Sequence, residues 1–176
     1  MILAPQEQIE DYTERGWWGT DTLDDVFRRN AENAPSRLAV ADPLNRSDID
    51  GHAPRRLTYA ALDNEVARCA TALLDLGLVR DDVVAVQLAN SVDLLVVYLA
   101  CWRLGLIVSP TPVQWRAHEL GDILGFVRAK AVVTTGQIRG HDHAAMMETV
   151  LAGISPRPAL VVVGVDEWPA ADDARL

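Results

Sequence analysis

The 176-residue chain lacks several features that mark whole classes of protein. Its two cysteines, Cys69 and Cys101, lie far apart in apolar stretches, which excludes a disulfide scaffold and a cysteine metal site and predicts buried free thiols in a reducing compartment. The most apolar run, residues 94–102, is too short to cross a bilayer. The first residues lack the basic and apolar regions of a signal peptide. These absences predict a soluble, cytoplasmic protein with no membrane partner.

Basic residues are also scarce. Sixteen Lys and Arg against 25 Asp and Glu give a formal charge of −9, which argues against non-specific binding to nucleic acid. The same balance leaves room for a local basic site that holds a phosphate. With 49% hydrophobic and 23% charged residues, the chain has the composition of an ordinary globular domain, and disorder is excluded.

The hydrophobic pattern predicts alternating helices and strands. Thr22 and Thr58 each precede apolar residues at helical spacing, and Gly77 ends the second of these helices. Short apolar strands then alternate with helices, which is typical of a mostly parallel sheet covered on both faces. The pattern predicts an α/β fold of three αβα layers, with strands at 38–41, 83–88, 106–108, 131–134 and 159–163 and later helices near 92–104, 120–127 and 142–152.

Composition divides the chain into three parts. Residues 1–21 are polar and aromatic and are expected to form an N-terminal arm lying on the domain. Residues 22–167 form the predicted α/β subdomain, and residues 168–176 a polar tail or a linker to a missing remainder. Within the subdomain, residues 42–56 are rich in Pro, Asn, Ser, Asp and Gly and are predicted to be a long loop.

Several sequence blocks, in order, resemble those of adenylate-forming enzymes, the superfamily of acyl-CoA synthetases and AMP-binding ligases. Three are general to the family and three resemble its medium-chain and alicyclic or aryl acyl-CoA ligase branch. Ala61 and Ala89 depart from the pattern, standing where the family has Glu and Pro. The blocks are 57–62 (L-T-Y-x-E-L), 83–90 (V-A-V-x-L-P-N), 103–110 (R-x-G-x-x-x-x-P), 115–120 (Y-R-x-x-E-L), 12–18 (the N-terminal arm) and 138–142 (F-R-G-x-D).

The resemblance implies the N-terminal subdomain of an AMP-forming acyl- or aryl-CoA synthetase, about the first third of such an enzyme. The parent reaction joins a carboxylate to ATP, giving an acyl-adenylate, and then transfers the acyl group to CoA. ATP, Mg²⁺ and CoA are therefore expected for the complete enzyme. The family's phosphate loop, ribose-binding acid and catalytic lysine have no counterpart here, so no catalytic residue and no cofactor is expected in this chain, and the chain alone is expected to be inactive.

Two segments imitate functional motifs. Residues 134–140 imitate the second half of the phosphate loop, T-T-G-x-P-K-G, with Arg139 in place of the lysine. The leading T-S-G is absent, so a coincidental match at a strand end is the preferred interpretation. The two histidines and the aspartate at 141–143 have the residue types of a metal site, but nothing nearby completes a ligand set. Solvated residues at the start of a helix are the preferred interpretation of His141, Asp142 and His143, and no metal is expected.

Arg116 is the one candidate binding residue. It follows the strand end at Pro110–Pro112, and α/β sheets place ligands outside the carboxyl ends of their strands. In the CoA ligases that this chain resembles, basic residues of this neighbourhood approach the CoA nucleotide. The alternative is a solvated arginine in the first turn of a helix.

Three functional interpretations stay open. The first is a part of a complete synthetase, with the remainder in cis. The second is one half of a split synthetase, with the remainder in trans, or a non-catalytic binding module. The third, an unrelated nucleotide-binding domain, is disfavoured because no G-x-G-x-x-G follows a strand. A sheet cut from a larger domain leaves an apolar edge, so self-association through exposed apolar surface is also expected.

Overall fold

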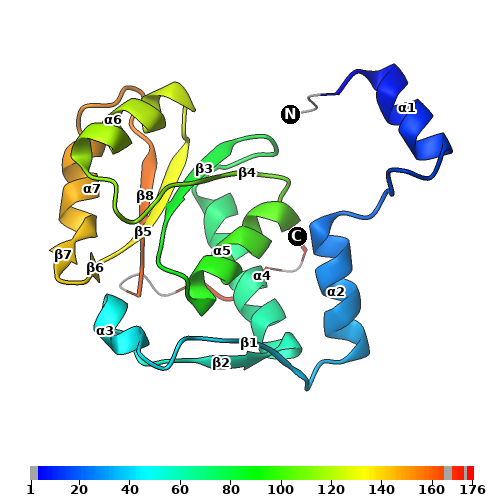
Figure 1. Cartoon of the computed structure of the whole chain (residues 1–176), viewed down its shortest axis with the longest axis horizontal. Coiled ribbons are helices and arrows are strands. Elements are labelled where there is room, and N and C mark those ends of the chain that lie inside the picture. Colours follow the sequence, from blue (N-terminus) through cyan, green and yellow to red (C-terminus); the bar gives the residue numbers. More distant parts are fainter. Residues whose placement is uncertain (1–3, 165–167, 173) are drawn as a thin grey trace.

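A four-stranded parallel sheet forms the centre of the molecule, as the computed structural model shows for residues 4–164, 168–172 and 174–176 (Figure 1). Its strand order is β4-β3-β5-β8, and every neighbouring pair is parallel. Each strand is a short apolar run, as expected for a sheet buried on both faces. The strands are β3 (Val83–Gln87), β4 (Ile107–Pro110), β5 (Ala131–Thr135) and β8 (Ala159–Val163).

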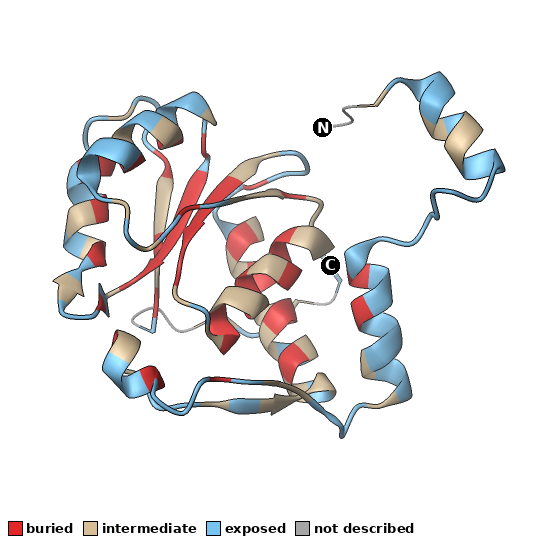
Figure 2. Ribbon diagram, viewed as in Figure 1, coloured by how far each residue is buried: buried red, intermediate tan, exposed pale blue. Residues whose placement is uncertain are grey.

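Helices cover both faces of this sheet (Figure 1). Successive residues of β3 point to opposite faces, so Val84 and Val86 join one buried cluster with α4 and α5, while Ala85 joins another with α6 and α7. Buried residues run along the sheet and the inner helix faces (Figure 2). The predicted three-layer α/β fold is confirmed. The covering helices are α4 (Tyr59–Asp75), α5 (Val92–Arg103), α6 (Ala117–Phe126) and α7 (His143–Leu151).

The two helices predicted to start after Thr22 and Thr58 start at those residues. The Thr58 side chain accepts from the backbone N–H of Ala61 at 3.3 Å. Thr22 and Asp25 form a reciprocal capping box at the start of α2 (Leu23–Asn33). Gly77 adopts a φ of 79° just after α4, a conformation that favours glycine.

Residues 42–56 are not a loop, and this prediction was wrong. They contain α3 (Arg46–Asp50) and the start of β2 (Arg56–Thr58), which pairs antiparallel with β1 (Leu38–Ala41) in a separate two-stranded ribbon. The predicted strand at 38–41 exists but lies outside the main sheet. The polar composition that suggested a loop instead supplies a buried network of ion pairs, described below.

The N-terminal arm contains a helix, α1 (Gln6–Glu14), with no buried residue. Its Tyr12 ring packs edge-on against Trp18 with centroids 5.0 Å apart, and also contacts Trp17 at 5.3 Å. In Figure 1 the helix projects away from the sheet and does not lie on the domain as expected. The arm is therefore held together by its own aromatic residues.

The tail runs along α4. Arg68 donates to the carbonyls of Trp168 and Pro169, and the Asp172 backbone N–H donates to the Thr71 hydroxyl at 3.0 Å. The expected boundary between subdomain and tail falls at residues 165–167, which lie outside the described residues, as do residues 1–3.

The two cysteines are free and buried, as predicted. Among the described residues, no helix combines the length and apolar character needed to cross a membrane.

Candidate functional site

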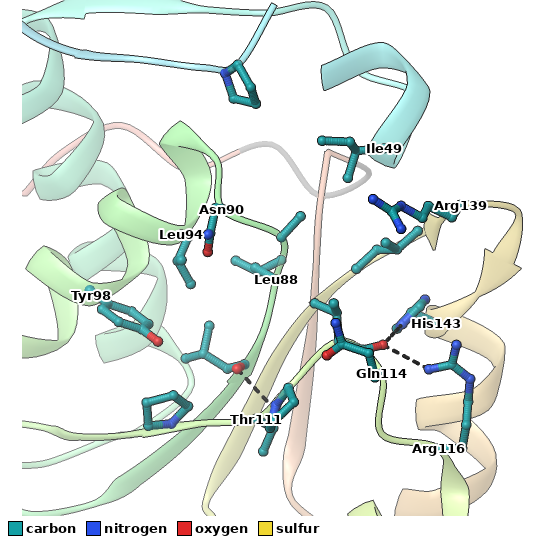
Figure 3. Close-up of a pocket in the computed structure, with 17 residues that line it drawn as sticks. Ile49, Leu88, Asn90, Leu94, Tyr98, Thr111, Gln114, Arg116, Arg139 and His143 are labelled. Carbon is teal, nitrogen blue, oxygen red and sulfur yellow. Dashed lines mark hydrogen bonds between the residues drawn. The ribbon is translucent and has the colours of Figure 1, made fainter. Parts of the chain in front are cut away.

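A cavity of about 700 Å³ opens at the carboxyl ends of β3 and β4 (Figure 3). The chain leaves β3 toward α5 on one face and leaves β4 toward α6 on the other, so the ends of these neighbouring strands diverge. Ligands of open α/β sheets bind at such a point. Leu88, Leu94 and Tyr98 form an apolar wall, and the β4–α6 connection, with Thr111, Gln114 and Arg116, lines the cavity as well.

The charge of the cavity is opposite to that of the whole chain. Arg116 and Arg139 both line it, and no carboxylate does among the described residues. The field of Arg116 reaches His141, whose pKa is lowered by partial burial and by that guanidinium. A cavity with two arginines in a chain of charge −9 favours an anionic ligand.

Arg139 reaches the cavity through a tight hairpin. β6 (Gln137–Ile138) and β7 (His141–Asp142) pair antiparallel across the two-residue turn Arg139–Gly140. Both turn residues have positive φ, 48° and 78°, as a type I′ turn requires. The Arg139 backbone N–H donates to the Ile49 carbonyl at 2.7 Å, which fixes the turn against α3.

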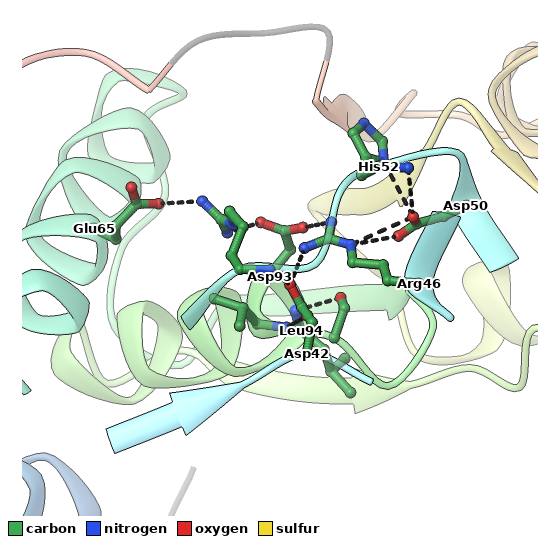
Figure 4. A network of polar contacts seen from close by, with 10 residues as sticks. Asp42, Arg46, Asp50, His52, Glu65, Asp93 and Leu94 are labelled. Carbon is green, nitrogen blue, oxygen red and sulfur yellow. Dashed lines mark hydrogen bonds and ion pairs between the residues drawn. The ribbon is translucent and has the colours of Figure 1, made fainter. Parts of the chain in front are cut away.

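Buried ion pairs hold α3 near the cavity (Figure 4). The Arg46 guanidinium contacts three carboxylates, those of Asp42 (2.6 Å), Asp50 (3.2 Å) and Asp93. Asp93 also pairs with Arg55, which pairs with Glu65 on α4. The network joins the β1–β2 ribbon, α3 and the first turn of α5, and so positions one side of the cavity.

Comparison with known proteins decides the family. The model of the AMP-binding enzyme family matches residues 27–175. The chain belongs to this family.

Its relatives are longer ligases. Over 176 residues, all of this chain, it is 34% identical to the salicyl-AMP ligase / salicyl-S-ArCP synthetase of Mycobacterium tuberculosis, and covers 30% of that protein. It is 32% identical over 119 residues, 68% of this chain, to the medium-chain fatty-acid–CoA ligase of Escherichia coli, of which it covers 19%. The apo structure of Mycobacterium smegmatis MbtA superposes with a TM-score of 0.74 at 26% identity, covering 98% of this chain and 29% of that one. The chain thus corresponds to the N-terminal part of the AMP-forming ligases of this family and spans about 30% of their length in the two Mycobacterium comparisons.

The segment that imitates the phosphate loop, residues 134–140, does not form a loop with free backbone and hydroxyl donors for ATP phosphates. Thr134 and Thr135 are buried, and the Thr134 hydroxyl donates to the Gln87 carbonyl at 3.3 Å. The Gly136 carbonyl accepts from the backbone N–H groups of His143 and Ala144. The segment is a strand end followed by a hairpin, so the Thr134 hydroxyl and the Gly136 carbonyl serve the fold, while Arg139 lines the cavity.

The expectation of solvated residues at the helix start holds for Asp142, which is exposed and caps α7, but it was wrong for His143. His143 is fully buried, with Nδ1 3.0 Å from the His141 carbonyl and Nε2 3.2 Å from the Val113 carbonyl. Among the described residues, no group of three or more His, Cys, Asp or Glu side chains could hold a metal ion.

Arg116, the predicted binding residue, is exposed at the start of α6 and lines the cavity. Sequence reasoning placed it at the correct strand end but missed Arg139 as a second cation of the same cavity. Gly140 after Arg139 fits a two-residue hairpin turn, but nothing in the sequence says that this turn reaches the cavity.

Proposed function

We propose that this chain is the N-terminal part of an enzyme that activates an acyl or aryl carboxylic acid. The carboxylate oxygen attacks the α-phosphorus of ATP, pyrophosphate leaves, and the acyl-adenylate then passes its acyl group to the thiol of CoA with release of AMP. The match to AMP-binding enzymes over residues 27–175 carries this proposal. ATP and Mg²⁺ would be held by the remainder of the ligase.

The contribution of this chain would be one wall of the CoA approach. The cavity at the strand ends has the size of a small-molecule site, with an apolar wall on one side and polar groups that include two arginines. Arg116 and Arg139 offer guanidinium donors to the phosphates of CoA, and such pairs favour a bidentate geometry. Tyr98 and Leu94 would face its apolar portion.

Calorimetric titration of the chain with CoA tests this role. Arg116→Ala should weaken CoA binding about tenfold, because one charge-assisted hydrogen-bonding partner is lost. Arg157→Ala is the matched control, since Arg157 is an equally exposed arginine, paired with Glu148 and outside the cavity lining. Unchanged CoA affinity in Arg116→Ala would dismiss the assignment.

Two alternatives make different predictions. One half of a split synthetase would need a second chain carrying the ATP site, and a non-catalytic module would bind CoA without any such partner. Reading the coding sequence beyond the codon for Leu176 separates these cases: continuation into a T-S-G-T-T-G-type loop supports the single-chain ligase. Carboxylate-dependent ATP–pyrophosphate exchange by the 176 residues alone would contradict the expected inactivity.

A further inference from the structure

Side chains from β3, from α7 and from its own last residue contact the backbone of the connection between β4 and α6, residues 111–116. It forms one wall of the cavity and contains no helix or strand of its own, so its backbone carbonyls need partners. The carbonyls of Pro112, Val113 and Trp115 lie within hydrogen-bond distance of the side chains of Gln87, His143 and Arg116. The wall therefore has the position that these side chains give it.

The first side chain is that of Gln87, at the end of β3. Its side chain is fully buried, and Nε2 donates to the Pro112 carbonyl at 2.9 Å and to the Trp115 carbonyl at 3.3 Å. Because both contacts are to carbonyl oxygens, the amide can have only this orientation. Gln87 thus fixes the two ends of the turn.

The second side chain is that of His143, at the start of α7. Its Nε2 lies 3.2 Å from the Val113 carbonyl, midway along the wall (Figure 3). Its Nδ1 lies 3.0 Å from the His141 carbonyl. Both ring nitrogens face a carbonyl oxygen, so the contact with Val113 is a hydrogen bond in the protonation states that carry a hydrogen on Nε2.

The third side chain is that of the cavity arginine itself. Arg116 Nη1 donates to the Val113 carbonyl at 2.8 Å and to the Trp115 carbonyl at 2.9 Å. The side chain is exposed, so these carbonyls are what orient its guanidinium. Any shift of Val113 moves the guanidinium with it.

We propose that His143 is a positioning residue for the cavity wall formed by residues 111–116. It donates a hydrogen bond from Nε2 to the Val113 carbonyl and thereby sets the orientation of Arg116. The wall contact stands on geometry alone, whereas the consequence for CoA rests on the proposed function. His143 belongs to the cavity lining, but its side chain is fully buried and both ring nitrogens already face carbonyl oxygens, so its proposed role runs through Val113 and not through contact with CoA.

A matched pair of substitutions separates the two nitrogens. The His143→Gln side chain can place an amide donor near the Nε2 position, while His143→Asn reaches only the Nδ1 position. The readout is amide hydrogen exchange at Trp115, whose N–H donates to the Pro112 carbonyl at 3.1 Å within the wall. His143→Asn should speed this exchange about tenfold, the effect of losing one hydrogen bond, and His143→Gln should restore the native rate. The Val161 amide, in the centre of β8, reports any global loss of stability.

CoA titration of the same variants extends the test. His143→Asn should weaken CoA binding as Arg116→Ala does, and His143→Gln should not. Native exchange at Trp115 in His143→Asn, or rescue by Asn and not by Gln, would overturn the proposal. If exchange follows the prediction but no variant or native chain binds CoA, the positioning contact holds and the proposed function fails.

Long-range ¹H–¹⁵N spectra of the native chain give an independent check that needs no variant. They show which ring nitrogen of His143 carries a proton. A protonated Nε2 supports the donor role, and an unprotonated Nε2 overturns it even if His143→Asn does not fold.

Discussion

The carboxylate of Asp42 accepts a hydrogen bond of 2.6 Å from the backbone N–H of Val92, fifty residues later in the chain. The end of β1 thereby closes the first turn of α5, the helix whose residues Leu94 and Tyr98 line the cavity. A carboxylate occupies this helix start, and the two arginines of the cavity, Arg116 and Arg139, lie outside this helix. Asp42 thus connects the end of the β1–β2 ribbon to the helix that forms the apolar wall of the cavity.

Removing the central cation of the network should be severely destabilising. Arg46→Met leaves Asp42, Asp50 and Asp93 buried near one another without their common partner. We expect the free energy of unfolding, from urea denaturation, to fall by about 3–5 kcal/mol, as for other broken buried pairs. Arg157→Met removes an exposed pair and should cost less than about 1 kcal/mol. Equal losses in the two variants would contradict the structural role of the network.

The same network should make stability depend on acid pH. Burial disfavours the charged form of Asp42, but hydrogen bonds from Val92 and Arg46 outweigh it and lower its pKa. The stabilisation is therefore present above the unfolded-state pKa of about 3.9 and is lost as pH falls through the lower folded value. Asp42→Asn should reduce the pH dependence of the urea midpoint measured between pH 6 and pH 2. An unchanged slope would assign the acid sensitivity to other groups.

Arg103 should tie α2 to the rest of the molecule. Its buried guanidinium contacts Asp24 on α2 at 3.1 Å and Asp63 on α4 at 2.6 Å. Arg103→Leu should cost about 2–3 kcal/mol, because a charge-assisted pair of bonds is lost and Asp24 is left largely buried. Hydrogen exchange should accelerate first in α2. Asp63→Asn changes the more exposed partner and should cost less. Equal losses of stability in Arg103→Leu and Asp63→Asn would contradict the role of Arg103 in holding α2.

The thiols should react only in the unfolded chain. Burial raises the pKa of Cys101 to about 12 and that of Cys69 well above its ordinary value. A thiol reagent at pH 8 should therefore modify neither until urea unfolds the domain. Because the folded-state pKa is raised, the thiols stabilise the fold fully below the unfolded-state pKa of about 8.5. Above it, the free energy of unfolding falls by about 1.4 kcal/mol per pH unit for each thiol, until the pH reaches the folded-state pKa. Cys69→Ala with Cys101→Ala should lessen this alkaline loss, and an identical loss would refute the assignment.

The sequence was informative wherever local pattern determines structure. The strands at 83–88 and 159–163 and the cap at Thr58 were predictable, because short apolar runs and a threonine cap act over a few residues. The burial of Arg46 was not predictable. Its partners lie at positions 42, 50 and 93, and only the folded chain brings the last of these near the others. A polar stretch with long-range ion pairs looks like a loop when its partners are not known.

The candidate site was predictable in part for the same reason. Arg116 could be placed because a strand end precedes it directly in sequence. Arg139 comes from a separate hairpin, and the burial of His143 depends on the distant Val113 carbonyl. Neither relation leaves a local pattern in the sequence.

A chimeric ligase would show directly whether this domain works as the N-terminal part of an AMP-forming ligase. The 176 residues would replace the aligned segment of the Mycobacterium tuberculosis salicyl-AMP ligase, to which they are 34% identical. Salicylate-dependent ATP–pyrophosphate exchange would be measured beside the same enzyme without the segment. We predict exchange in the chimera and none in the truncated enzyme. A folded, monodisperse chimera without exchange would contradict the proposed function.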